Sequence, residues 1–262
     1  MARELARRGH SIVVMGRNTE KLASTKRSLE GEPNVGEVMT VCLDLSEASP
    51  ADYERIKNEI DPDNRDIGIL INNAGVGPID INTFENQDLN YMHKAINITI
   101  FSTLYLTNMI TPGMMKRRRG LIVNVTSIFG LIEQTLYMGV YGPIKHFLGC
   151  LGRQLFLENE HLSRPIDVIT LCPGPVPTKL LREHCKDGFF HVSAESYARS
   201  AINALSTKID SMVGVAWQAF WINVYLLFDL TGIVTRLYTF IVQLACNKDI
   251  GLYYNEYYRK TN

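Results

Sequence analysis

The chain has 262 residues, 46% of them hydrophobic, and its 27 lysines and arginines balance 27 aspartates and glutamates. This length suits one α/β domain with a full core, and the charge balance argues against a broad basic surface that would hold nucleic acid. Five cysteines without close pairs and six histidines without ligand spacing point to a reducing compartment and to no metal site.

The first part of the chain alternates apolar runs with amphipathic ones. Gly9 is expected to end the first helix, because glycine suits a helix C-terminal cap, and Thr19 is expected to cap the next helix. The expected elements here are a helix over 2–8, a strand over 11–15, a strand over 37–43 and a helix over 51–60.

Three later apolar runs each end in small or polar residues. They cover 67–71, 120–127 and 166–171, with a long helix over 88–115 between the first two and a helix containing Tyr141 between the last two. Strands that alternate with helices predict right-handed crossovers and a doubly wound parallel sheet. Ligands of such sheets collect at the carboxyl ends of the strands.

A phenol and an ammonium lie four residues apart, at Tyr141 and Lys145. On a helix this spacing puts both side chains on one face. A free tyrosine has a pKa of about 10, so a lysine cation beside it is expected to lower that pKa and allow proton chemistry. The alternative is a surface tyrosine next to a solvated lysine. Pro143 between them requires a helix that begins near Tyr141.

The chain resembles the short-chain dehydrogenase/reductase family through four motifs in a fixed order. These are Asn72-Asn73-Ala74-Gly75, Ser127, Tyr141-x-x-x-Lys145 and Pro173-Gly174-x-Val176-x-Thr178. The resemblance runs from the first residue to about residue 185 and implies a Rossmann-like fold. Residues 193–262 resemble more loosely the tail of the membrane-associated branch with 17β-hydroxysteroid dehydrogenases and very-long-chain 3-oxoacyl-CoA reductases. We therefore expect a reductase domain over 1–192 and an apolar helical extension over 193–262.

The resemblance implies that NADP is the cofactor. Arg17 would pair with its 2′-phosphate, the alternative being an ordinary surface arginine, and Asp44 would accept from the adenine amine, the alternative being a helix cap. Gly75 would let the backbone approach the adenosine ribose, and Val176 and Thr178 would contact the nicotinamide carboxamide. The residues implied to bind the cofactor are Arg17, Asp44, Asn72, Ala74, Gly75, Tyr141, Lys145, Pro173, Gly174, Val176 and Thr178.

The resemblance also implies three catalytic residues. Tyr141 would donate a proton to the carbonyl oxygen, Ser127 would hydrogen-bond that oxygen, and Lys145 would bind the ribose and lower the pKa of Tyr141. The family's long helix carries an asparagine that supports a proton-relay water. Counting back from the proline of that helix reaches Thr99, while Asn97 is expected to face elsewhere, so we expect an impaired relay.

One family segment is missing from the sequence. In the family, a first strand and a glycine-rich turn precede the helix that starts here at Met1. That turn supplies the N–H groups that hold the cofactor pyrophosphate. Since the missing strand lies mid-sheet in the family, its neighbours would be left unpaired about 9.5 Å apart, two strand spacings. We expect a partial chain.

The carboxyl-terminal part is apolar. Residues 211–228 contain no charge, and a second apolar stretch covers 237–246. We expect helices that lie in the membrane interface or cover an apolar substrate pocket, with a true span as the alternative. The last four residues, Arg259-Lys260-Thr261-Asn262, resemble a dibasic retrieval signal of the endoplasmic reticulum, although a plain basic terminus is equally open.

The first functional hypothesis is an NADP-dependent reductase of a ketone on an apolar substrate, either a 3-oxoacyl-CoA or a 17-ketosteroid, in lipid or steroid metabolism. It would lie on the endoplasmic reticulum membrane with its catalytic domain facing the cytosol, the alternative being cytoplasmic. A homodimer is left open. The second hypothesis is a catalytically impaired relative that acts as an interaction or regulatory protein, which Thr99 and the missing turn favour. In a third, the tail is a plain membrane anchor.

Overall fold

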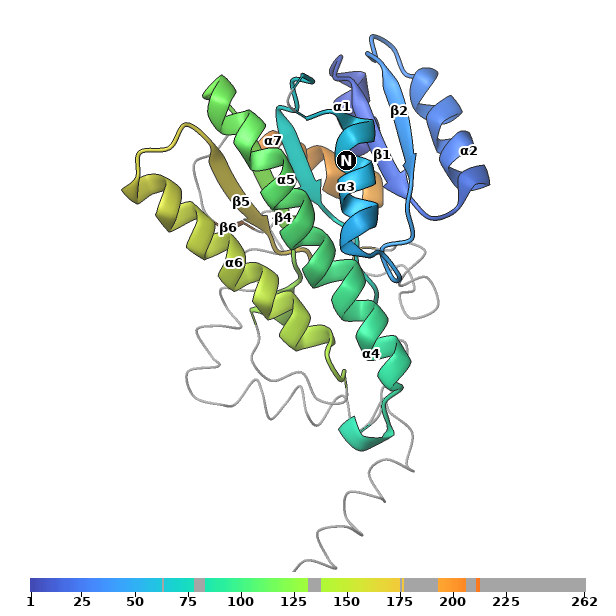
Figure 1. The fold of residues 1–262 in the computed structure, drawn as a ribbon, viewed down its shortest axis with the longest axis vertical. Helices are drawn as coiled ribbons and strands as arrows, with labels where there is room; N and C mark the ends of the chain where they lie inside the picture. Colours follow the sequence, from blue (N-terminus) through green and yellow to red (C-terminus); the bar gives the residue numbers. More distant parts are fainter. Residues whose placement is uncertain are drawn as a thin grey trace, which may run out of the picture.

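A computed structural model of the chain describes residues 1–62, 64–77, 83–131, 138–174, 176, 193–205 and 211–212 (Figure 1). Its strands are β1 (Ile12–Gly16), β2 (Val38–Cys42), β3 (Ile69–Asn72), β4 (Leu121–Val125), β5 (Asp167–Leu171) and β6 (Ser211–Met212). Its α-helices are α1 (Ala2–Arg7), α2 (Thr19–Glu30), α3 (Pro50–Ile60), α4 (Leu89–Ile96), α5 (Ser102–Arg117), α6 (Tyr141–His161) and α7 (Ala194–Ala204). Single turns of 3-10 helix cover Phe84–Asn86 and Ile128–Gly130, and a π-helical turn, Asn97–Phe101, joins α4 to α5.

All strand pairs in the described part of the chain are parallel, and helices connect successive strands, so the predicted doubly wound fold is confirmed. The strands form two sheets, one of β1 and β2 and one in the order β3-β4-β5-β6. The break between β1 and β3 is where the resemblance predicts an absent strand, and among the described residues these two strands are not paired with each other, as predicted.

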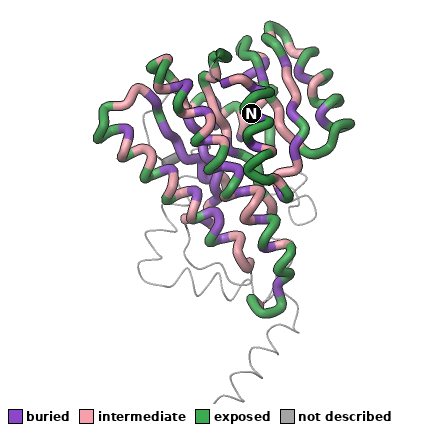
Figure 2. Tube along the Cα trace, viewed as in Figure 1, coloured by how far each residue is buried: buried purple, intermediate pink, exposed green. Residues whose placement is uncertain are grey.

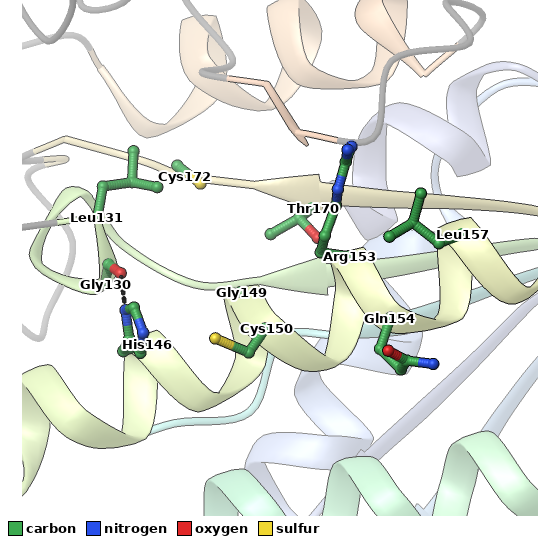
Figure 3. A pocket seen from close by; sticks show the side chains of 10 residues that line it. All are labelled: Gly130, Leu131, His146, Gly149, Cys150, Arg153, Gln154, Leu157, Thr170 and Cys172. Carbon is green, nitrogen blue, oxygen red and sulfur yellow. Dashed lines mark hydrogen bonds between the residues drawn. The ribbon is translucent and has the colours of Figure 1, made fainter.

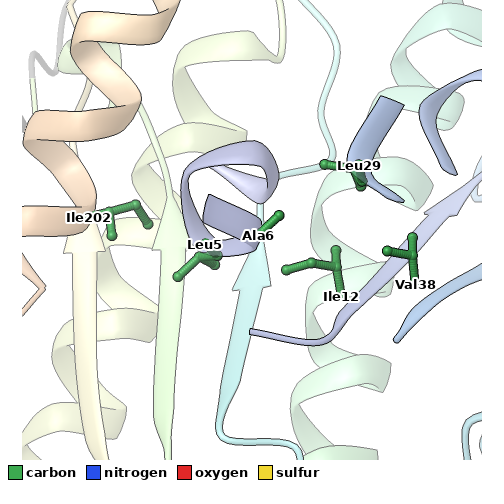
Figure 4. Close-up of a cluster of buried hydrophobic side chains, with 6 residues drawn as sticks. All are labelled: Leu5, Ala6, Ile12, Leu29, Val38 and Ile202. Carbon is green, nitrogen blue, oxygen red and sulfur yellow. The ribbon is translucent and has the colours of Figure 1, made fainter. Parts of the chain in front are cut away.

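Helices cover both faces of these sheets (Figure 1). On one face α1 and α7 pack against β1, β4 and β5; Figure 4 shows α1 with Leu5 and Ala6 beside Ile12 of β1. On the other face α3 and α5 cover β2, and α5 and α6 cover β4 and β5. The most buried segments are β4 and β5, at the centre of this arrangement (Figure 2).

Helix ends follow local chemistry. Asn18, not the predicted Thr19, caps α2, because its side chain accepts a hydrogen bond from the Lys21 amide while Thr19 already lies in the helix. Ser49 forms a capping box with Asp52 at the start of α3. Gly9 has φ +87°, a left-handed conformation that glycine adopts without strain, as expected for the end of α1.

The helix that carries the candidate catalytic pair starts at Tyr141, as Pro143 requires. Pro143 is its third residue, within the first turn, where the missing N–H would have no partner in the helix. The predicted long helix over 88–115 is also present, but the π turn interrupts it.

The described part of the predicted extension packs on the same core as the rest, because Tyr197 and Ala201 of α7 contact residues of β4 and β5. No helix within the described ranges has the length and apolar character that crossing a bilayer requires. The first two residues of the apolar stretch predicted over 211–228 form β6, and the rest of that stretch, the second apolar stretch and the dibasic end lie outside the described residues.

Candidate active site

Ser127, Tyr141 and Lys145 meet beyond the carboxyl end of β4. Ser127 follows that strand by two residues, and Tyr141 and Lys145 occupy the first two turns of α6. The Tyr141 hydroxyl is hydrogen-bonded to Ser127, and Lys145 Nζ donates to the carbonyl oxygen of Val125 at 3.1 Å. The structure therefore brings the three predicted catalytic residues together.

The phenol of Tyr141 is largely buried, with the Phe129 ring packed edge-on at a centroid distance of 6.2 Å. Burial raises the pKa of Tyr141, and the hydrogen bond with Ser127 opposes this in part. The prediction that Lys145 lowers this pKa is wrong for the chain without cofactor, because desolvation of the phenolate prevails. The phenol is consequently protonated at neutral pH.

Lys145 is only 7% exposed, and this burial lowers its pKa to about 8. Its backbone is fixed as well, since the Thr126 hydroxyl donates to the Lys145 carbonyl. The sequence did not predict that Thr126 and the Val125 carbonyl hold Lys145 in place. Their position directly before Ser127 could have indicated it. His146 contacts the Gly130 carbonyl through Nδ1 at 2.9 Å.

Gly75 leaves room for the Lys145 side chain. A methyl group added at Gly75 would lie 3.3 Å from Lys145 Nζ and 3.7 Å from Thr99 Oγ1. Thr99 thus lies beside the catalytic lysine, at the position that the proline count predicts. Asn97 is turned elsewhere, as predicted, because its Nδ2 donates to the Ser46 carbonyl at 2.9 Å.

Asn72 lies in the sheet rather than on its surface. Its Nδ2 donates to Thr107 Oγ1 at 3.1 Å and to Asn124 Oδ1 at 2.9 Å, and its side chain is buried. Asn124 is the register partner of Asn72 across β3 and β4. The structure therefore gives the Asn72 side chain a role in joining strands and does not place it toward a ribose. Ala74 and Gly75, by contrast, are exposed at the sheet edge.

Arg17 and Asp44 follow the adjacent strands β1 and β2, and Arg17 Nη1 lies 3.7 Å from Asp44 Oδ2. Asp44 Oδ1 accepts from the Ser46 hydroxyl at 2.7 Å and amide at 3.0 Å, and these bonds, led by the hydroxyl, hold the pKa of Asp44 below its usual value. The Arg17 side chain is 67% exposed, so its guanidinium is accessible to an anion.

The motif after β5 is described only in part. The Ile128 amide donates to the Pro173 carbonyl at 3.0 Å, which ties this segment to the residues that follow Ser127. Gly174 is half-buried, and Val176 packs against the core of β4 and β5. Thr178 lies outside the described residues.

A cavity of about 380 Å³ lies along another side of α6 (Figure 3). Its lining includes Gly149, Arg153 and Leu157 of α6 and Cys172 after β5, but neither Tyr141 nor Lys145. Cys172 is buried, as expected of a small core residue. Within the described ranges, no group of histidine, cysteine, aspartate and glutamate side chains is placed to hold a metal ion.

The residues present fit a nicotinamide nucleotide. Gly75 keeps open the space beside Lys145 that an added side chain would fill, and exposed residues stand at the carboxyl ends of β1 and β3. At the far end of this edge, Arg17 offers a guanidinium that matches phosphate geometry. The set therefore extends from a charged, solvent-accessible end to the half-buried phenol of Tyr141.

Comparison with known proteins places these features in context. A family model described as short chain dehydrogenase matches residues 1–187. The chain is 34% identical over 207 residues to hydroxysteroid dehydrogenase-like protein 1 of Gallus gallus, covering 78% of this chain and 60% of that protein. It is 32% identical over 209 residues to very-long-chain 3-oxoacyl-CoA reductase of Mus musculus, covering 79% and 64%. The chain thus spans less than two thirds of either relative.

A solved structure of similar fold is a short-chain dehydrogenase from Sphingobium yanoikuyae in complex with NADPH. The TM-score is 0.71 at 24% identity, with 91% of this chain and 89% of that chain covered. At this level of identity the likeness concerns the fold.

Proposed function

The chain belongs to the short-chain dehydrogenase family, and we propose that it is an NADP-dependent oxidoreductase that reduces a ketone on an apolar substrate. The observation that carries this proposal is the Tyr141 hydroxyl bonded to Ser127, with Lys145 one turn further along α6 and its ammonium bonded to the Val125 carbonyl two residues before Ser127. This combination of a protonated phenol, a hydroxyl and an ammonium supports protonation of a carbonyl oxygen.

Each residue has one task in the proposed reaction. Bound NADPH would supply the hydride that the carbonyl carbon receives. Tyr141 gives its hydroxyl proton to the carbonyl oxygen as the new C–H bond forms, and the alcohol results. Ser127 donates a hydrogen bond to that oxygen, and Lys145 stabilises the phenolate left on Tyr141. Because burial raises the pKa of Tyr141, the acid is fully protonated before the step.

The nucleotide would lie along the carboxyl ends of the strands. We propose that Arg17 pairs with the 2′-phosphate and that Asp44 accepts from the adenine amine, which is supported by their position at the ends of β1 and β2. Gly75 would admit the ribose next to Lys145, and Val176 and Thr178 would contact the carboxamide. The exposed guanidinium of Arg17 favours NADP over NAD.

The substrate is proposed to be a 3-oxoacyl-CoA or a 17-ketosteroid, hence a place in lipid or steroid metabolism. The support is that the relative at 32% identity is named a very-long-chain 3-oxoacyl-CoA reductase and that the one at 34% is named as like a hydroxysteroid dehydrogenase. We further propose that the protein associates with the endoplasmic reticulum membrane through residues 193–262, an extension of the domain over 1–192, with the catalytic part in the cytosol. The uncharged run over 211–228 supports this.

A second candidate function rests on the break between β1 and β3. That break lies between the residues proposed to bind the adenine end of the nucleotide and those proposed for catalysis. A chain that cannot bridge it would keep the fold without turnover, as an interaction or regulatory protein.

One experiment separates these functions. The protein is given NADPH with a long-chain 3-oxoacyl-CoA or, separately, a 17-ketosteroid, and absorbance at 340 nm is followed alongside NADPH binding by calorimetry. The proposal expects binding and consumption with one of the two ketones, and loss of consumption in Tyr141→Phe. If NADPH does not bind at saturating concentration, the oxidoreductase function fails and the second candidate stands.

A further inference from the structure

The π-helical turn between α4 and α5 has side chains directed to two different regions. Asn97, its first residue, donates from Nδ2 to the Ser46 carbonyl at 2.9 Å, in the loop that follows β2. Thr99, two residues later, lies beside Lys145, because both are close to the point where a Gly75 methyl group would be. Residues two apart in a helix do not face the same side, so one short turn contacts both the loop beyond β2 and the catalytic lysine.

The Ser46 carbonyl requires a partner. Ser46 is only 2% exposed, and buried backbone carbonyls are almost always hydrogen-bonded. Four residues later α3 begins at Pro50, which has no N–H to offer to this carbonyl. The Asn97 amide supplies the hydrogen bond. His93, one turn earlier, orients that amide, since its Nδ1 lies 3.4 Å from Asn97 Nδ2.

Ser46 in turn holds Asp44. Its hydroxyl and its amide both donate to Asp44 Oδ1, at 2.7 Å and 3.0 Å, and these bonds lower the pKa of Asp44, the hydroxyl most of all. The Asp44 side chain is still 40% exposed, so a ligand can reach the carboxylate. A displacement of Ser46 would therefore release a carboxylate that is now held in one orientation.

The other contacts between this loop and the long helix are less directional. Lys94 Nζ lies 3.6 Å from Glu47 Oε1, but both side chains are more than half exposed, and such an ion pair contributes little. Leu45 packs on the same apolar cluster as residues of α5, and apolar contacts do not fix the direction of a polar group. Among the described residues, no backbone ladder joins β1 to β3. The Asn97 hydrogen bond is therefore well placed to fix the loop.

We propose that Asn97 is a positioning residue for the nucleotide: its amide holds the Ser46 carbonyl, and Ser46 thereby presents the Asp44 carboxylate to the adenine amine. The inference rests on the proposed function, in which Asp44 accepts a hydrogen bond from that amine. Adenine is common to NADPH and NADH, so the effect concerns both nucleotides, whereas the contact proposed for Arg17 concerns NADPH alone. Asn97 itself needs no contact with the nucleotide.

The first measurement is the Asp44 pKa in the whole protein without nucleotide, by NMR of ¹³C-labelled aspartate carboxylates, with the resonance assigned by its loss in Asp44→Asn. Asn97→Leu removes the amide at similar volume, and Asn97→Gln keeps an amide. Asn108→Leu is the matched control, because Asn108 is an exposed asparagine on α5. The charged and titratable neighbours of Asp44 and Asn97 are kept in every variant; they are Arg17, Glu47, His93 and Lys94.

Loss of the Asn97 amide weakens the bonds from Ser46 to Asp44, so Asn97→Leu is expected to raise the Asp44 pKa by about half a unit to one unit. Ser46→Ala should raise it too, and the double variant should shift it by less than the sum, because both changes act through the same bonds. Asn97→Gln and Asn108→Leu should stay close to the unmodified protein. Thermal unfolding checks that each variant is folded, and Asn97→Ala replaces Asn97→Leu if leucine is not accommodated.

The second measurement is nucleotide affinity, by calorimetry at neutral pH. Asn97→Leu should raise the Kd for NADPH and for NADH by the same factor, about three- to tenfold, and Asn108→Leu should change neither. The inference is overturned by an unchanged Asp44 pKa in the folded variant, by additive shifts in the double variant, or by unchanged affinity for both nucleotides. If the pKa rises as expected while no form of the protein binds NADPH, the positioning of Asp44 by Asn97 stands and the proposed function fails.

Discussion

The two sheets differ in how completely their apolar residues are buried. In the four-stranded sheet, the central apolar residues of β4 and β5 are at most 2% exposed, as in Ile122 and Ile169. In the two-stranded sheet, Val13, the second residue of β1, is 42% exposed, although a parallel strand is normally buried on both faces. Among the described residues, β1, which lies beside the break, is therefore less covered than β4 and β5.

The functional residues divide in the same way. The catalytic candidates follow β4 or lie on α6, at the four-stranded sheet; they are Ser127, Tyr141 and Lys145. The charged pair of Arg17 and Asp44 instead follows the strands of the two-stranded sheet. The residues proposed for catalysis and the charged pair proposed to bind the nucleotide therefore lie at the ends of different sheets, and changes in the two regions should have different effects.

Amide hydrogen exchange should show the largest contrast. The Ile12 amide donates to the Glu37 carbonyl in the direction of β2, and backbone groups alternate direction along a strand, so the amides of Val13 and Met15 face the break. We expect these two to exchange roughly 10³-fold faster, or more, than those of Val123 and Ile169, which open only with the whole domain. NMR exchange rates measure this, and equal protection in both strands would remove the contrast.

Replacing the catalytic lysine should affect kcat rather than stability. Lys145→Met is expected to lower kcat by about 10²- to 10⁴-fold, because the phenolate on Tyr141 loses its neighbouring cation. His146→Gln is the control, since His146 faces the Gly130 carbonyl, and it should change kcat only a few-fold. Steady-state NADPH oxidation gives both values; equal losses in the two variants would argue for a general packing effect.

Substitutions of two glycines in α6 test how tightly this helix packs on the four-stranded sheet. A methyl group at Gly152 would overlap the Thr170 hydroxyl on β5, whereas one at Gly149 would meet nothing within 4 Å. Gly152→Ala should therefore destabilise the protein by about 1–3 kcal/mol. Gly149→Ala should be neutral or stabilising by up to about 1 kcal/mol, because alanine favours the helix. Urea unfolding compares them, and the same effect for both would contradict this packing.

The smallest change is expected in nucleotide affinity, at Arg17 beyond the two-stranded sheet. Arg17→Ala should raise the Kd for NADPH about tenfold, close to 1.4 kcal/mol, and leave the Kd for NADH unchanged, because only NADPH carries the 2′-phosphate. Lys26→Ala, which removes a cation paired with Glu30 on α2, is the control and should change neither value. Calorimetry measures the Kd of each nucleotide. If Arg17→Ala weakens the binding of NADPH and NADH equally, Arg17 does not contact the 2′-phosphate.

Most of the fold was predictable from the chain. Apolar runs bounded by polar turns located the strands to within a few residues, and the four ordered motifs brought Ser127, Tyr141 and Lys145 to one place. The position of the break between β1 and β3 also followed from the order of the motifs.

The remaining features depend on packing that sequence patterns do not encode. The π turn at Asn97–Phe101 contains neither proline nor glycine, so nothing local marks it. Asn72 pairs with Asn124 only because of the strand register. The opposite pKa shifts of Tyr141 and Lys145 arise from burial, which the four-residue spacing alone cannot reveal.

The central claim is that Tyr141 protonates a carbonyl while NADPH reduces it. The most direct measurement uses NADPH deuterated at both C4 positions, with the alcohol formed from the ketone analysed by mass spectrometry and NMR. The account predicts one deuterium at the carbinol carbon for each NADPH consumed, and almost none with Tyr141→Phe, which still binds NADPH. Product without deuterium, or equal labelling by Tyr141→Phe, would contradict it.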